Sequence, residues 1–458
     1  MSHQELAEAV ASRAKEFEIP GAAVGVLVDG VEITACHGVT NVEQPQPVDD
    51  RTLFHLASLS KTFTATAVMR LAQEGRLELG ATVRSYVPEL RLADELATAE
   101  ITVLNLLNHT SGLDWNLIDL RPEDVSLAAF VARMAELPLI AKPGARASYS
   151  QAGYNLLGRV VEKVTGQPFE QAMRELVLEP AGLTNTFYGL DDVIIRRFAV
   201  GHNRSEDGEL RLAHPWKSWP AGVLGNDPGG GAISAVSDLL RWARFQLGSG
   251  EGVLPTEVLD QMKEPTVDLR GSSLGHAFGL GWFLKDVGGV RTVGHGGSGN
   301  CQYSDLLIVP ERNFAVVALA NAGPVGYPFT QAVLQWALER YLGVVEQDPE
   351  PSPYDVARAR EVVGRYTNGA MNLDVADTGD GLTLAVEIKP EIRSGSADDM
   401  PPDLPPAAMG FLSRDGDDYI VTEGGLKGQR GYFSREDSGT VTGVDLAGRL
   451  FTRLSDAI

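Results

Sequence analysis

The chain has 458 residues, more than a single hydrophobic core usually organises, so one large unit and a smaller one are expected. Hydrophobic residues make up 43% and charged residues 22%, which excludes a disordered or fibrous protein. The 39 Lys and Arg against 61 Asp and Glu give a net charge of −22, which argues against nucleic acid and anionic membrane surfaces as partners.

Cysteine and histidine usage predicts neither a disulfide framework nor a metal site. Cys36 and Cys301 are the only cysteines, and the histidines, His202 and His214 among them, lack metal-ligand spacing. No cofactor motif occurs, so we expect no metal and no cofactor. The first residues are too charged for a secretory signal, and no segment is apolar enough to span a membrane. We expect a cytoplasmic protein with a small-molecule substrate; a homo-oligomer stays open.

In chain order, helical and β-type segments predict an α+β fold. Residues 6–17 have helical spacing, and two β-type runs around Asp29 and Gly30 predict a hairpin. Residues 58–247 are mainly helical in pattern. A second hairpin is predicted over residues 305–320, and residues 330–342 then have the spacing of an amphipathic helix. We therefore expect an antiparallel sheet built from both ends, flanked by helices and a helical subdomain, with the active site between the halves.

The C-terminal quarter has a different sequence pattern. Residues 346–355 are charged and rich in proline, which predicts a linker between a unit of residues 1–345 and one of residues 356–458. Beyond the linker, short β-type runs alternate with Gly and Asp turns, as in a small all-β barrel. A loop at residues 391–407 interrupts them. Loops of that length are usually functional or disordered, and both alternatives stay open.

The first chemical motif is Ser58 with Lys61, at the start of a predicted helix. Their separation of three residues places both side chains on one helix face. A serine hydroxyl needs a neighbouring base to become a nucleophile, and a buried lysine with a lowered pKa can be that base. The helix N-terminus adds positive charge where an oxyanion would form. Alone, Ser-x-x-Lys is common, and a surface turn is the ordinary alternative.

Two further segments offer groups that could complete such a site. Tyr149 and Gln151 lie on a short loop before a predicted helix, and residues 293–299 are too rich in glycine for an ordinary strand. Glycines let a ligand approach the backbone and leave an amide free for an oxyanion. An interface aromatic and a β-bulge are the ordinary alternatives. The candidate binding residues of the glycine-rich segment are His295, Gly296, Gly297 and Ser298.

The order and context of these motifs resemble the serine β-lactamase and penicillin-binding-protein family. Its members include class C β-lactamases, D-aminopeptidases and family VIII esterases, and they share Ser-x-x-Lys, Tyr-x-Asn and a Lys-Thr-Gly-like triplet. The resemblance extends to residues 101–113, 154–166 and 279–282, and it covers roughly residues 7–342. It implies a β-lactamase/transpeptidase-like fold and a serine hydrolase that cleaves amides or esters of small substrates.

The resemblance also implies roles for individual residues. Ser58 would form the acyl-enzyme, Lys61 would orient it and shuttle its proton, and Tyr149 would act as base and then protonate the leaving group. Backbone amides of Ser58 and Ser298 would form the oxyanion hole. His109 is structural in this family.

Two departures from the family pattern affect the expected substrate. Gln151 stands where asparagine is usual and reaches one methylene further, so contacts to a substrate amide should shift. His295 stands where β-lactamases and cell-wall peptidases usually have lysine, and a neutral histidine is a weaker clamp for a carboxylate. The departure at His295 favours amidase, aminopeptidase or esterase activity over penicillin hydrolysis.

Two other functions remain open at this point. An acyltransferase would use the same acyl-enzyme with an amine or alcohol acceptor. A non-catalytic binding or sensing protein is disfavoured by the intact set of Ser58, Lys61 and Tyr149. An α/β-hydrolase is rejected because no Gly-x-Ser-x-Gly elbow occurs. The C-terminal region resembles the lipocalin-like barrel of some family members, and we hypothesise that residues 391–407 reach the active site and restrict what enters.

Overall fold

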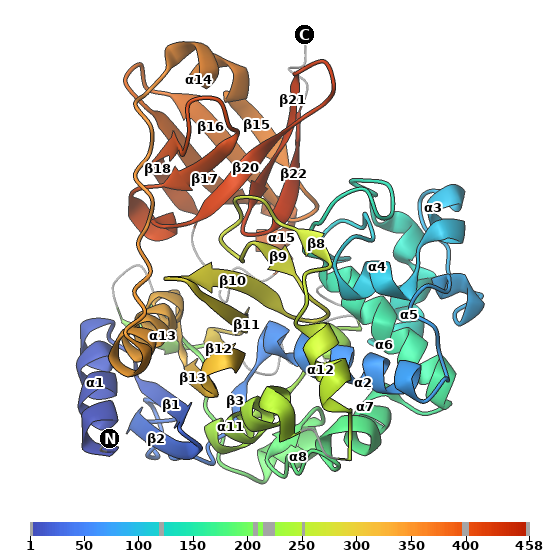
Figure 1. Cartoon of the computed structure of the whole chain (residues 1–458), viewed down its shortest axis with the longest axis vertical. Helices are drawn as coiled ribbons and strands as arrows, with labels where there is room; N and C mark the ends of the chain where they lie inside the picture. The colour runs from blue at the N-terminus through green and yellow to red at the C-terminus, as the bar shows by residue number, and fades with distance from the viewer. Residues whose placement is uncertain are drawn as a thin grey trace.

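The structure is a computed structural model that describes residues 3–118, 123–204, 209–213, 225–249, 252–395 and 403–454. A large antiparallel sheet with helices on both faces forms one part, a helical group lies beside it, and a closed barrel covers one end (Figure 1). This arrangement confirms the predicted α+β fold with a C-terminal barrel.

The main sheet has eight strands in the order β2-β1-β13-β12-β11-β10-β9-β8. Both predicted hairpins are confirmed, and β1 pairs with β13, so that Ala22 lies opposite Ala320. The two ends of the predicted larger unit therefore meet in one sheet. The strands are β1 (Gly21–Val28), β2 (Val31–Gly38), β8 (Val267–Asp268), β9 (Ala277–Phe278), β10 (Phe283–Val287), β11 (Val290–Gly299), β12 (Gln302–Val309) and β13 (Phe314–Ala320).

Alternation along the strands gives the sheet two apolar faces. In β1, Val24 and Val26 pack against α1 (His3–Glu16) and α13 (Gly326–Leu342), while Ala23 and Leu27 join the core under α11 (Val236–Arg244). Successive strand residues point to opposite faces, so a strand covered on both sides is apolar throughout. The fully buried β1 and β13 follow that rule.

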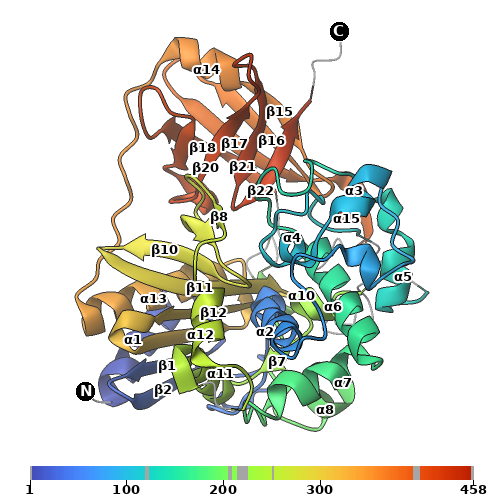
Figure 2. The ribbon, with the colours of Figure 1, turned by 45° about the vertical axis from the view of Figure 1, so that its right-hand side comes forward.

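The helical group lies beside the main sheet, to its right in Figure 2. Short strands β3 (Phe54–His55), β4 (Thr186–Phe187) and β7 (Ile233–Ser234) form a small sheet at its edge, and β5 (His202–Arg204), β6 (Leu210–Leu212) and β14 (Ala322–Gly323) form another. Its remaining helices are α2 (Ser60–Gln73), α3 (Glu95–Glu100), α4 (Val103–Leu107), α5 (Leu127–Ala132), α6 (Gln151–Thr165), α7 (Phe169–Met173), α8 (Leu190–Ile194), α10 (Asp227–Gly230) and α12 (Thr256–Met262).

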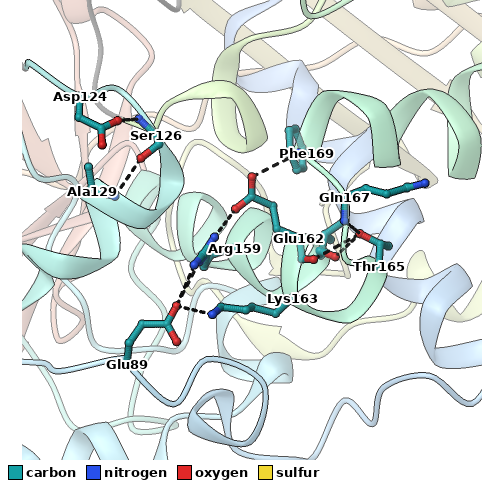
Figure 3. Close-up of polar contacts among 11 residues, drawn as sticks. Glu89, Asp124, Ser126, Ala129, Arg159, Glu162, Lys163, Thr165, Gln167 and Phe169 are labelled. Atoms are coloured by element: carbon teal, nitrogen blue, oxygen red, sulfur yellow. Dashed lines mark hydrogen bonds and ion pairs between the residues drawn. The ribbon is translucent and has the colours of Figure 1, made fainter.

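Helix α6 is fixed at both ends. The Ser150 side chain caps its N-terminus by accepting the N–H of Gly153, and Gly166 ends it with a left-handed φ of 73°. On its surface Arg159 lies between Glu89 and Glu162, at 3.0 and 2.8 Å (Figure 3). Because Gln151 is the first residue of α6, these contacts also fix a candidate site residue.

The C-terminal barrel is closed and has its own core. Tyr366, Tyr419, Phe433 and Phe451 are buried inside it. No helix or strand occurs between α13 and α14 (Val356–Val362), where the linker was predicted; the unit boundaries at residues 345 and 356 stay a prediction. The barrel strands are β15 (Gly364–Thr367), β16 (Met371–Asp377), β17 (Leu382–Ile388), β18 (Leu404–Phe411), β19 (Asp418–Val421), β20 (Arg430–Arg435), β21 (Val441–Leu446) and β22 (Arg449–Arg453).

Hydrogen bonds dock the barrel on the rest of the molecule, where Figures 1 and 2 both show it above β8 to β10. The N–H of Tyr149 donates to the carbonyl of Gly448 at 2.7 Å, and the N–H of Leu450 donates to Ser148 Oγ at 3.2 Å. The N–H of Gly369 donates to the carboxylate of Asp114 at 2.8 Å. The barrel therefore binds directly to the loop that carries Tyr149. In the described residues, no helix combines the length and apolarity that a membrane crossing needs.

Candidate active site

Ser58 lies on a short 3-10 turn, η1 (Ala57–Leu59), immediately before α2. Ala57 has a left-handed φ of 44°, a backbone conformation that costs roughly 1–2 kcal/mol for a residue with a side chain. Ser60 holds the turn in place, because its hydroxyl donates to Ala57 O at 2.6 Å and accepts the N–H of Ala232 at 2.9 Å. The strained turn leaves Ser58 partly exposed to the cavity.

Lys61 is fully buried, and its amine contacts three oxygens. Nζ lies 3.2 Å from Ser58 Oγ and 2.7 Å from the carbonyl of Gly229, and it also contacts Oε1 of Gln151. Burial holds the pKa of Lys61 well below its usual value, and the positive charge of Arg449 lowers it further. A neutral amine has two N–H donors and one lone pair. In that form, with both donors on the carbonyl oxygens of Gly229 and Gln151, the lone pair would face Ser58.

Tyr149 is buried beside this pair. Its ring centroid lies 4.9 Å from Lys61 Nζ, and its hydroxyl has no hydrogen-bond partner within the described part of the chain. Burial raises the pKa of Tyr149 to about 12, against smaller opposing effects of Arg449 and Ser58. A phenol with that pKa is protonated at neutral pH. Burial therefore disfavours the charged form of both groups, the ammonium of Lys61 and the phenolate of Tyr149.

The ring of His109 packs against the ring of Tyr149, as the structural role of this histidine in the family implies. The two rings are 4.5 Å apart, and Nδ1 of His109 accepts the N–H of Ser150 at 3.1 Å. Burial holds the pKa of His109 well below its usual value, so the ring is neutral.

His295 on β11 is also neutral. Burial lowers its pKa to about 3, and Phe283 stacks on its ring at 4.2 Å. Nδ1 lies 2.7 Å from the carbonyl of Gly296 and must carry the proton, because a carbonyl oxygen only accepts. Nε2 is then a lone pair, buried and without a hydrogen-bond partner among the described residues. His295 thus offers an acceptor, which suits a substrate N–H or O–H and not a carboxylate.

The glycines of β11 let this strand approach Ser58. A Cβ built on Gly297 would lie 2.0 Å from Leu56 O and 2.9 Å from the backbone nitrogen of Ser58, so only glycine fits. The β11–β12 hairpin closes with a two-residue turn at Asn300 and Cys301. In such a hairpin, the backbone N–H and C=O groups of every second residue point away from the partner strand. Ser298 is one of these residues. The Ser298 amide is therefore directed to the open edge where Ser58 lies.

Gln151 lies away from the cavity. Its Oε1 contacts Lys61, and its Nε2 donates to Asn155 and Asn226 at 3.2 and 2.9 Å. The extra methylene relative to asparagine lets the amide reach these partners. Its predicted contact with a substrate amide stays a prediction, while its contact with Lys61 gives it a positioning role.

Arg449 is a site residue that the sequence analysis missed. It begins β22, and its guanidinium lies 4.8 Å from the centroid of the Tyr149 ring. Nη1 donates only to Ala447 of its own turn, at 3.2 Å, and Nε is buried without a partner in the described chain. Burial lowers the pKa of Arg449, and within the described residues its guanidinium forms no ion pair with a carboxylate. The charge of Asp445 raises the pKa of Arg449, and burial raises the pKa of Asp445 itself to about 8.

One cavity of about 440 Å³ joins these groups. Ser58, Tyr149, the predicted residues His295, Gly296, Gly297 and Ser298, and Arg449 all line it. The barrel contributes Gly425, Leu426, Gln429, Ala447 and Arg449. None of these belongs to residues 391–407, of which 396–402 lie outside the described residues; the described remainder forms the end of α15 (Pro390–Gly395) and the start of β18. The hypothesis about that loop stays a prediction. His214 also lies outside the described residues, and no metal-holding cluster of His, Cys, Asp or Glu occurs within them.

The site combines a serine with a buried lysine and tyrosine on a β-lactamase-like fold, and comparisons with known proteins agree with that class. A profile of the Beta-lactamase family matches residues 6–337. The chain therefore belongs to this family of β-lactamases, penicillin-binding proteins and related serine hydrolases.

Individual relatives cover most of the chain. Penicillin-binding protein 4 of Amycolatopsis lactamdurans is 31% identical over 355 residues, which cover 75% of this chain and 92% of that protein. Protein flp of Staphylococcus aureus is 27% identical over 70% of this chain, and the alignment spans only 63% of flp. The crystal structure of SurE is similar with a TM-score of 0.76 and 25% identity, and covers 99% of both chains, the barrel included.

Proposed function

We propose that the protein cleaves amide or ester bonds of small substrates through an acyl-enzyme on Ser58. The observation that carries the proposal is the position of the buried Lys61 amine, whose Nζ lies 3.2 Å from Ser58 Oγ and also contacts the Gly229 carbonyl and Oε1 of Gln151. Lys61 takes the serine proton as Ser58 Oγ attacks the carbonyl carbon. The amides of Ser58 and Ser298 stabilise the negative charge that develops on the substrate oxygen.

Tyr149 acts in the second half of acylation. Its protonated hydroxyl donates to the leaving nitrogen or oxygen, and Lys61 returns a proton to the tyrosine, so no charge accumulates in the site. Water then attacks the ester on Ser58 by the same route in reverse and releases the acid.

The polar groups at the cavity define the substrate further. His295 accepts a hydrogen bond from the substrate, and Arg449 binds an anionic group near the scissile bond. Arg449 thus supplies the positive charge that His295 lacks. The substrates that fit are carboxylate-bearing amides or esters, including D-amino acid derivatives.

The decisive experiment combines turnover with trapping. Wild type should hydrolyse p-nitrophenyl esters and become labelled on Ser58 by a serine-reactive phosphonate, as read by mass spectrometry. Ser58→Ala should lose both. Ser85→Ala is the matched control, because its hydroxyl is exposed and contacts Thr82 outside the cavity, and it should still be labelled. Equal turnover by Ser58→Ala and wild type would overturn the assignment, and a wild type without turnover or labelling would favour a non-catalytic binding protein.

An acyltransferase is the second candidate. Barrel residues cover the cavity beside Ser58, which leaves a sheltered place for an acceptor other than water. Added amines would then divert the acyl group into amide product at the expense of acid. A cytoplasmic location and a homo-oligomer stay predictions, the latter to be measured by light scattering.

A further inference from the structure

The cavity at Ser58 continues around the edge of the main sheet. β11 pairs with β10 only up to Gly294, so residues 295–299 form an open edge. The cavity passes over this edge beneath the barrel and reaches the face that α13 covers, where Asp305, Leu307 and Gln331 line it. The reaction proposed above uses no group from this second half.

Asp305 lies close to the reactive centre, although on the opposite face of β11. It pairs with Gly296 in the ladder, and a Cβ built on Gly296 would be 2.5 Å from Oδ1 of Asp305. The next residue, Gly297, approaches the Ser58 amide from the other face. Gly296 and Gly297 are neighbours on the strand, but their side-chain positions lie on opposite faces, so a substrate arm that joins Ser58 to Asp305 has to pass over the open edge.

The Asp305 carboxyl lacks a counter-ion. It forms no ion pair within the described residues, and burial raises its pKa to about 7. Hydrogen bonds from Thr330 and Gln331 lower that pKa, but no cation contributes. The cations nearby, Lys285 and Arg430, both bind Glu346. A half-buried carboxyl without a cation is an unfavourable arrangement that a cationic ligand would relieve.

The walls of this half of the cavity are largely apolar. Strands β10 and β12 supply Val287 and Leu307, and α13 supplies Leu334 and Leu338. Such walls favour a methylene chain, because the burial of apolar surface stabilises the complex. The half-cavity thus matches an aliphatic arm that ends in a positive charge.

We propose that this half-cavity is a second subsite, which binds a terminal ammonium or guanidinium group with Asp305 as its counter-ion. The inference rests on the proposed hydrolysis at Ser58 and narrows its substrate class to amides or esters that carry a basic, lysine-like arm.

Matched substrates test the subsite in the full chain. The p-nitrophenyl esters of N-acetyl-lysine and N-acetyl-norleucine, each as D and L forms, differ in the terminal ammonium. Wild type should prefer the lysine ester. Asp305→Asn should reduce kcat/KM for it by about tenfold, the contribution of roughly one charge-assisted hydrogen bond, and should leave the norleucine ester unchanged. Asp286→Asn, on the neighbouring strand β10 and paired with Arg291 outside the cavity, is the control and should alter neither.

A binding experiment separates this proposal from the proposed hydrolysis. Calorimetry on Ser58→Ala should show tighter binding of N-acetyl-lysine methylamide than of its norleucine counterpart, and addition of Asp305→Asn should abolish the difference. If wild type hydrolyses the norleucine ester but Asp305→Asn leaves the lysine preference unaltered, the subsite is wrong and the hydrolase stands. If no ester is hydrolysed, the hydrolase fails, and equal affinities of the two methylamides for Ser58→Ala would overturn the subsite as well.

Discussion

Replacement of Arg449 by methionine should lower kcat/KM more for substrates with a free carboxylate than for neutral ones. Methionine keeps much of the apolar stem and removes the guanidinium. Protein stability should change little, because the side chain's hydrogen bond within the described residues goes to Ala447 of its own turn and the barrel docks through backbone groups of Gly448 and Leu450. The variant therefore tests the charge at the site with the fold intact.

The size of the effect follows from the position of the charge. Two unit charges about 4 Å apart attract by roughly 4 kcal/mol at an effective dielectric constant of about 20. Desolvation of Arg449 and of the substrate removes part of this, and hydrogen bonds to charged groups contribute about 1.5–3 kcal/mol net. Arg449→Met should thus reduce kcat/KM by roughly 10- to 100-fold for a substrate with a free carboxylate.

The assay compares an amide that carries a free carboxylate with its methyl ester. The methyl ester should lose less than about threefold, since the guanidinium has no anionic partner there. Arg453→Met is the control: Arg453 lies on the same strand, and its guanidinium binds the carbonyls of Glu361 and Val363. An equal loss for both substrates would refute an anion-binding role and assign Arg449 to the positioning of Tyr149.

Two further predictions concern the lysine and the glycine strand. The pKa of Lys61 is lowered on folding. Between that lowered value and about 10.5, the unfolded chain therefore binds one more proton than the folded chain. In this pH range the wild type should gain up to about 1.4 kcal/mol of stability for each unit by which the pH rises. Lys61→Met should lack this gain in urea denaturation at pH 7 and 10; parallel pH profiles would contradict a neutral Lys61. Gly297→Ala should reduce kcat at least about 100-fold, because its Cβ would push β11 away from the Ser58 amide. Gly289→Ala, whose Cβ meets nothing within 4 Å, should cost only stability, and equal kcat values would refute the close approach.

Local sequence signals predicted most of the fold. The hairpins at β1–β2 and β12–β13 are marked by tight turns between apolar runs, and α13 by its apolar spacing. The pairing of Ser58 with Lys61 was predictable because both lie within one helical turn. These features depend on residues that are neighbours in the sequence.

The rest depends on contacts between distant segments. Arg449 follows a Gly turn in a barrel strand and resembles any exposed strand arginine, and nothing near it in the sequence indicates Tyr149. Gly229 accepts a hydrogen bond from Lys61 through its carbonyl, a group that every residue possesses. Asp305 occupies an alternating strand position where a surface carboxylate would be ordinary. Such groups gain their significance only from the tertiary packing around them.

The backbone hydrogen bond from Tyr149 to Gly448 makes the β21–β22 turn of the barrel a structural support of the loop that carries Tyr149. Exchange of barrels between relatives would therefore depend on one tight turn, with Ala447 and Gly448 both in left-handed conformations, far more than on the barrel's interior. The interior can be repacked as long as its own volume is filled. The turn must keep its shape, because the insertion or deletion of one residue there would displace the side chain of Tyr149.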